Sequence, residues 1–169
     1  MEIWTYSPDD VQVLIGGVLP VEGLAEGTFV EITKDIMPHT STRATDGTVG
    51  RLRKSNSTYT VNISIMAGSP TNDLLTKIWL LDEQWGIGKF PFMVKDSLGT
   101  GYFFSATTWI EVIPTLSYGT DMPTRTWGLR SNQGVINIGG NGDESVVSEL
   151  TTLALNNFPL VKDLVGAFL

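Results

Sequence analysis

The sequence lacks the residues on which most catalytic and metal sites depend. It contains no cysteine, which excludes disulfides, thiolate nucleophiles and cysteine-based metal centres. Its one histidine, His39, lies in a stretch rich in proline, threonine and serine, and is better interpreted as a loop residue than as a general base. With one histidine and no cysteine, a zinc site would need mostly carboxylate ligands, which is rare. We therefore expect no catalytic residues, no metal and no cofactor.

The motifs of the common enzyme classes are also missing. The runs GIGK at 86–89 and GTG at 99–101 lack the spacing of a phosphate-binding loop, and both fit turns. There is no G-x-S-x-G elbow to present a nucleophilic serine. Acidic neighbours such as Asp82-Glu83 do not stack on a helix, so they are better interpreted as solvated charge than as a catalytic pair. We expect that the protein is not an enzyme.

Charged residues are scarce and unbalanced, and long apolar runs are absent. Charged residues make up 17% of the chain, and the net charge is −7. This acidic balance argues against tight nucleic-acid binding, because lysine and arginine must neutralise the phosphates. The apolar segment 158–169 is too short to span a bilayer, and Met1-Glu2-Ile3 lacks the basic start of a signal peptide. We expect a soluble product of the cytoplasm with no membrane partner.

The residues that are present favour a β-rich domain with many turns. Residues 58–66, TYTVNISIM, alternate apolar and polar side chains and predict a strand. Residues 71–85 predict one helix, with Ser69 as its cap, Pro70 at its first position and Gly86 as its end. Further strands are expected at 10–15, 27–33, 90–96, 101–113, 123–130 and 135–138. In the strand at 101–113, the even-numbered positions are mainly apolar and the odd-numbered face is mixed.

A long polar segment at 35–57 interrupts this pattern and is expected to be an irregular loop. Between His39 and Ser57 it carries four basic residues and one acidic residue, Asp46, which gives +4 − 1 = +3 and leaves −7 − 3 = −10 for the rest. A basic arm on an acidic body suggests a chain that docks on copies of itself. We predict contacts with other subunits through Arg43, Arg51, Arg53 and Lys54; the alternative is a solvated, mobile loop.

The order of these segments resembles the tail tube proteins of contractile-tailed bacteriophages. The residues that carry the resemblance are Ala44-Thr45-Asp46-Gly47, the strand Thr58 to Met66, and the helix start Ser69-Pro70-Thr71-Asn72-Asp73-Leu74-Leu75. The match covers roughly Tyr6 to Gly140. It implies a mainly β fold with one flanking α-helix (α+β), arranged as a tail-tube-type β-sandwich or barrel. The loop at 35–57, including Asp46 and Gly47, would reach a neighbouring subunit or ring.

The resemblance also implies a function and a set of partners. Subunits of this family form hexameric rings that stack into the inner tail tube, which conducts phage DNA during ejection without binding it specifically. The implied partners are the chain itself, the tail sheath protein, and the tape measure, baseplate and tail terminator proteins. The implied location is the virion, after assembly in the host cytoplasm. Related tubes of type VI secretion and bacteriocin-like contractile injection systems are an alternative.

Two further expectations follow for the ends and faces of the chain. Residues 1–140 are expected to form the tube domain, and 141–169 a helical extension, which pads the barrel, binds an adjacent subunit or meets the sheath. A conduit for DNA needs a neutral or acidic lumen. Glu31 and Glu111 lie on polar strand faces and are candidate lumen residues; the alternative is that they face bulk solvent.

The sequence is compatible with two hypotheses, a self-assembling subunit and a monomeric binding module. Exposed strand edges template pairing with other chains, so we expect strands to pair between subunits. A monomeric β-sandwich that binds a small ligand or peptide is the competing reading from another functional class. Ring symmetry, helical parameters, sheath contacts and host do not follow from the sequence.

Overall fold

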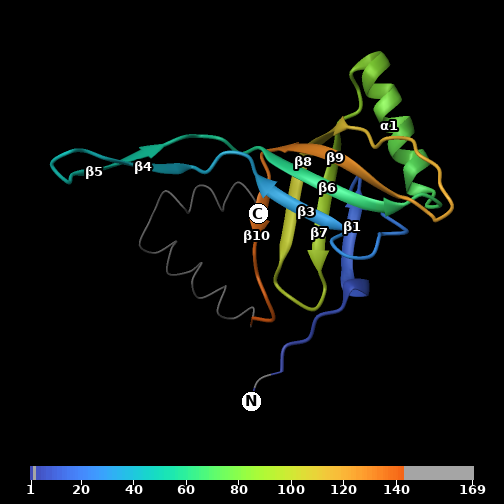
Figure 1. Cartoon of the computed structure of the whole chain (residues 1–169), viewed down its shortest axis with the longest axis horizontal. Coiled ribbons are helices and arrows are strands. Elements are labelled where there is room, and N and C mark those ends of the chain that lie inside the picture. Colours follow the sequence, from blue (N-terminus) through green and yellow to red (C-terminus); the bar gives the residue numbers. More distant parts are fainter. Residues whose placement is uncertain (2, 143–169) are drawn as a thin grey trace.

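The computed structural model describes residues 1 and 3–142, so almost all of the predicted extension at 141–169 lies outside the described residues. Ten strands, one α-helix and one short 3-10 helix make up the described part (Figure 1). In chain order they are η1 (Pro8–Asp10), β1 (Val11–Ile15), β2 (Leu19–Pro20), β3 (Val30–Lys34), β4 (His39–Arg43), β5 (Val49–Arg53), β6 (Tyr59–Met66), α1 (Thr71–Trp85), β7 (Phe90–Asp96), β8 (Tyr102–Val112), β9 (Thr124–Asn132) and β10 (Val135–Asn137).

Eight of the strands form one antiparallel sheet that folds over on itself. Its order is β2-β1-β7-β8-β9-β6-β3, and β10 adds to β8 beside β9. In Figure 1 the strands β3, β6 and β9 cross the direction of β1 and β7, so the two halves face each other as a sandwich. The end strands β2 and β3 do not pair with each other, so the described sheet is not a closed barrel. The predicted fold class, mainly β with a flanking helix, is confirmed.

The strand predicted at 58–66 is the centre of the core. In β6 buried and half-buried residues alternate without interruption, and Val61, Ile63 and Ile65 are fully buried. Their cross-strand neighbours on β9, Leu129 opposite Val61 and Trp127 opposite Ile63, are buried as well. Apolar side chains from both halves of the sheet therefore meet on this face, and their removal from water is the main stabilising contribution to the fold.

The long strand β8 departs from the simple alternation expected for it. Phe103 and Ser105 are buried, but so are Thr108 and Ile110, so the buried face changes from odd to even positions. The change coincides with a shift of register between β7 and β8, because Phe92 pairs with Ser105 whereas Phe90 pairs with Thr108. A bulge inserts one residue and moves the following side chains to the other face. In the first half of the strand the apolar even positions Tyr102 and Phe104 are therefore exposed, and the buried side chains stand at odd positions.

The helix begins where the sequence predicted, and its first turn is anchored to the sheet. The Ser69 hydroxyl accepts a hydrogen bond from the Thr71 N–H (3.2 Å) and donates to the Glu22 carbonyl (2.5 Å). The buried Asn72 amide donates to the Met66 carbonyl (2.9 Å) and accepts from the Trp127 indole N–H (3.0 Å). The Ser-Pro-Thr-Asn motif is thus both a cap and a tie to β9. Among the described residues, no helix is sufficiently long and apolar to cross a membrane.

The segment predicted as an irregular loop is instead an ordered hairpin. Its strands β4 and β5 pair antiparallel from His39 opposite Arg53 to Arg43 opposite Val49. A short turn joins them, in which Gly47 has a φ of +89° and Asp46 accepts the Thr48 N–H (2.9 Å). Short hairpin loops of this kind place a residue in the left-handed region, which favours glycine. We call residues 38–54 the arm; it extends away from the sheet (Figure 1).

Candidate assembly surfaces

The arm presents its arginines on one face. Residues directly opposite each other on an antiparallel pair point to the same side, so the register decides which side chains lie together. The pairs His39–Arg53, Ser41–Arg51 and Arg43–Val49 share one face, which we call the arginine face. The other face carries the pairs Thr40–Leu52 and Thr42–Gly50, none of which is charged.

Lys54 does not join the three arginines. It follows Arg53 with its backbone N–H bonded to the Pro38 carbonyl (2.7 Å), so the alternation directs its side chain away from the arginine face. All ten residues of β4 and β5 are exposed. The two ion pairs of the described residues both involve Arg130, so none of the arm arginines has a carboxylate partner there. Three unpaired positive charges on one face of an extended hairpin are suited to a partner outside this protomer.

Asp46 and Gly47, the other two predicted contact residues, lie in the turn at the tip of the arm. The Asp46 carboxylate accepts a hydrogen bond from the Thr48 N–H, and hydrogen bonding to Thr48 lowers the pKa of this exposed carboxyl. Gly47 supplies the positive φ that the turn requires. Both residues therefore have a role in shaping the arm itself. Whether another subunit touches them stays a prediction.

A second surface is the polar face of the sheet across β3, β6, β9 and the end of β8. The partially exposed side chains of β6, Thr60, Asn62 and Ser64, alternate with its buried ones. Glu31 lies opposite Asn62 on β3, and Arg130 lies opposite Thr60 on β9, so both share this face. Hydroxyl groups continue it, since the Ser64 and Thr126 side chains are hydrogen-bonded (3.1 Å). We call this surface the polar face.

Arg130 joins two carboxylates beside this face. The sequence did not predict this role for Arg130. Its Nε donates to Glu111 (2.7 Å) and one terminal nitrogen donates to Asp35 (2.6 Å), while the Thr60 hydroxyl also donates to Asp35 (2.5 Å). Glu111, a predicted lumen residue, is therefore neutralised in part. Glu31 has no such ion pair among the described residues. The three carboxylates and one guanidinium leave −3 + 1 = −2 around this face.

The hydrogen bonds of this network shift the pKa values of Asp35 and Arg130. Burial by itself raises the pKa of the Asp35 carboxyl, but the hydrogen bonds from Thr60, Thr58 and Arg130 outweigh it, and the pKa is held below its ordinary value. The hydrogen bond to Glu111 raises the pKa of the Arg130 guanidinium. Asp35 is thus kept ionised by its neighbours. Within the described residues, no cluster of three or more histidine, aspartate or glutamate side chains is arranged to hold a metal ion.

Comparisons with known proteins give one relative by sequence and several by fold. No protein-family model matches the chain. The chain is 27% identical over 161 residues to "Structural protein ORF10" of Pseudomonas phage KPP10, which covers 90% of this chain and 93% of the relative. The match extends over nearly the whole of both chains.

The solved structures that share the fold come from contractile injection systems. The anti-feeding prophage cap, a tube-terminating cap, matches with a TM-score of 0.56 at 11% identity over 81% of this chain and 93% of that chain. A chain of the sheath–tube complex of the PVC extracellular contractile injection system matches with a TM-score of 0.54 at 10% identity, over 79% and 91%. The PVC sheath/tube terminator gives 0.54 at 10% identity, over 80% and 98%. The resemblance to contractile tail tube proteins drawn from the sequence is therefore confirmed at the level of the fold.

Proposed function

We propose that this chain is the structural subunit of the inner tail tube of a contractile-tailed phage. It assembles into stacked rings, hexameric by family resemblance, which conduct DNA during ejection. The observation that carries the proposal is the combination of a contractile-system fold with an arm on an acidic body, whose arginines have no ion-pair partner among the described residues. The named relative is a structural protein of a phage, which supports a virion component over an enzyme.

The polar face is the surface that we assign to the lumen. It is built from threonine, serine and asparagine side chains, with Glu31 and the partly neutralised Glu111 among them. Such a face has a net negative charge and no exposed cluster of lysine or arginine, and therefore does not hold a polyanion. DNA passing along it meets short polar groups and weak repulsion. This assignment retains both predicted lumen residues and adds Asp35 and Arg130.

The open sheet supplies the edges through which subunits join. On the side away from β6, β3 has no strand partner among the described residues, and β2 at the other end has two residues. Unpaired edges template strand addition, which in a ring satisfies the backbone groups of every subunit. The partners that we propose are therefore neighbouring copies first. The sheath and terminator follow by analogy with the solved systems, and the tape measure and baseplate proteins by family resemblance.

Negative-stain electron microscopy of the purified protein tests the proposal. A tube subunit forms hollow cylinders of uniform width, and their amount rises steeply with protein concentration. Sedimentation velocity of the same samples gives the matching measure in solution. A chain that remains a monomer at the highest attainable concentration contradicts the proposal and favours the reading as a monomeric binding module.

A second candidate follows from the identity of the structural neighbours. Two of them are a cap and a terminator, and the two PVC structures come from an extracellular contractile injection system. A terminator binds the end of a tube and does not extend it, so it forms single rings, not long cylinders, in the same microscopy experiment. Neighbouring genes separate a phage tail from a secretion or bacteriocin-like system: capsid and terminase genes indicate the former.

A further inference from the structure

The arginine face of the arm is suited to an acidic acceptor, and the surface of the body offers a hollow of matching chemistry. This hollow has a volume of about 640 Å³ and lies between η1, the start of β1 and the segment 21–29. The exposed carboxylates of Asp9 and Glu26 line it, together with the apolar side chains of Val11, Leu24 and Phe29. Among the residues that the structure describes, no lysine or arginine lines it. We call it the acidic groove.

Three other hollows of the described surface fit the arm less well. The hollow beside α1 is lined by Arg125, which repels an arginine. The hollow at the end of β10 has one carboxylate, Asp96, and that carboxylate already accepts the Leu98 N–H (3.0 Å). The hollow beside Phe104 has no charged residue. The acidic groove therefore combines two carboxylates without ion-pair partners in the described chain with an apolar floor.

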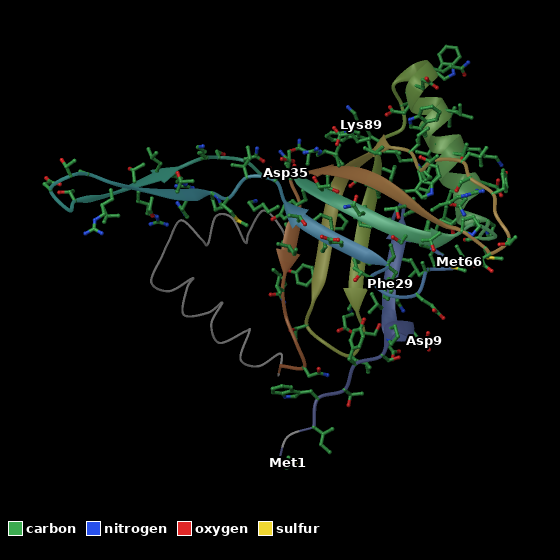
Figure 2. The ribbon with its side chains drawn as sticks, in the orientation of Figure 1. Met1, Asp9, Phe29, Asp35, Met66 and Lys89 are labelled. Carbon is green, nitrogen blue, oxygen red and sulfur yellow. The ribbon has the colours of Figure 1, made fainter. Side chains whose placement is uncertain are left out.

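The arm of a protomer points away from its own groove. Strand β3 connects the two features: Phe29 in the groove precedes it and Asp35 at the base of the arm follows it. Figure 2 shows Phe29 and Asp9 on one side of the body and Asp35 on the other, where the arm departs in the opposite direction. An arm that reaches an acidic groove must therefore belong to another copy. Such a contact joins two different surfaces and repeats from copy to copy.

We propose that the arm of one copy lays its arginine face over the acidic groove of the next copy. Arg51 and Arg53 pair with the carboxylates of Asp9 and Glu26, and the exposed Val49 and the aliphatic arginine stems cover the apolar floor. This inference rests on the proposed self-assembly and specifies which surfaces meet. Covering apolar atoms beside the ion pairs excludes water and strengthens the charge interaction, as in the centre of a protein interface.

Charge exchange tests the contact in the full chain. The variant R51E/R53E reverses the arm and D9R/E26R reverses the groove. Each is expected to lower the fraction of protein that pellets as tubes by at least about tenfold, because like charges then face each other. Mixing the two variants restores tubes, since each reversed surface then has a complementary partner on the other variant. The variant carrying all four substitutions also recovers assembly by itself.

A matched control reverses two exposed acids elsewhere. E83R/D121R changes the net charge as much as D9R/E26R but at sites outside the groove, and it is expected to pellet like the wild type. Circular dichroism and thermal melting confirm that each variant folds. If D9R/E26R is unfolded, the neutral variant D9N/E26Q replaces it, with a smaller expected loss of tubes and a weaker dependence of assembly on salt.

The outcomes separate the two proposals. Wild-type tubes together with undiminished tubes from folded D9R/E26R overturn the contact and leave the proposed function standing. Failure of both the mixture and the four-fold variant to recover assembly likewise overturns the contact. A wild-type chain that never assembles overturns the proposed function, and the contact with it. Recovery by the mixture, with loss in each single preparation, supports both.

Discussion

The arm and strand β6 are neighbours in the sequence, but they differ in how many of their side chains are buried. Every second residue of β6 is buried in the sheet, whereas all ten strand residues of the arm are exposed. A two-stranded hairpin alone is marginally stable in water, so the arm gains little from its own chain. The difference indicates where the stabilising contacts lie. Those of β6 are within the protomer, and we propose that those of the arm lie with a neighbouring copy.

The largest expected effect on stability comes from a substitution in the core of β6. Ile63→Ala removes a fully buried side chain and leaves a cavity, which costs about 2–5 kcal/mol of unfolding free energy. Leu52→Ala in the arm is the matched control: it shortens a similar aliphatic side chain that is 53% exposed, and is expected to change unfolding by less than about 0.5 kcal/mol. Urea unfolding at a concentration below assembly measures both. Equal losses would show that the arm packs within its own protomer.

An intermediate effect concerns the base of the arm, where Asp35 joins it to the sheet. Because its pKa in the folded state is below the unfolded value, the stability that Asp35 contributes is present above about pH 4. It is lost as the pH falls through the lower folded-state pKa. Asp35→Asn removes this dependence and costs about 1 kcal/mol at pH 7 through the lost charged hydrogen bonds. Urea midpoints at pH 7 and pH 3 check it.

The comparison with the wild type across pH isolates this one group from the other carboxylates. The stability difference between the wild type and Asp35→Asn narrows as the pH falls. A difference that stays constant between pH 7 and pH 3 would show that Asp35 contributes through its shape and not through its charge. Asp121→Asn, at an exposed site without an ion pair in the described chain, serves as the control and is expected to leave the urea midpoint at pH 7 unchanged.

The smallest expected effect on stability comes from removing the arm. The Lys54 N–H already bonds to the Pro38 carbonyl at 2.7 Å, so an Asn-Gly turn in place of 39–53 joins two adjacent chain ends. We expect unfolding to change by less than about 0.5 kcal/mol while tubes disappear from electron micrographs. A truncated chain that still forms tubes would show that the arm is not needed for assembly. A truncated chain that fails to fold would show that the arm is needed for the folding of its own protomer.

Local patterns in the sequence predicted the core elements, because the physics that forms them is local. The alternation of TYTVNISIM and the signals Ser69, Pro70 and Gly86 gave β6 and α1 nearly to the residue. The sequence of the arm does not predict its two strands, because they carry threonine, serine and arginine and have no apolar face to mark the alternation. Both faces of a strand exposed to water leave no hydrophobic pattern.

The sequence did not predict the pairing register of the strands or the contacts between residues far apart in the chain. The grouping of Arg43, Arg51 and Arg53, and the exclusion of Lys54, depend on which residues pair across the hairpin. The Arg130 network was hidden for another reason: Asp35 lies 95 residues before it, and only the folded sheet brings them together. The bulge in β8 likewise reverses a face without a proline or glycine inside the strand to announce it.

In the proposed assembly, the edge of β3 that has no strand partner among the described residues also affects when polymerisation begins. Until a subunit joins its neighbours, this edge remains available to any extended chain in the crowded cell. If the arm must first be captured by a neighbour, the edges align only after that encounter. Growth then shows a lag followed by rapid elongation from existing ends, and seeds of preformed tube abolish the lag. The order of two contacts on one subunit would thus decide when polymerisation starts.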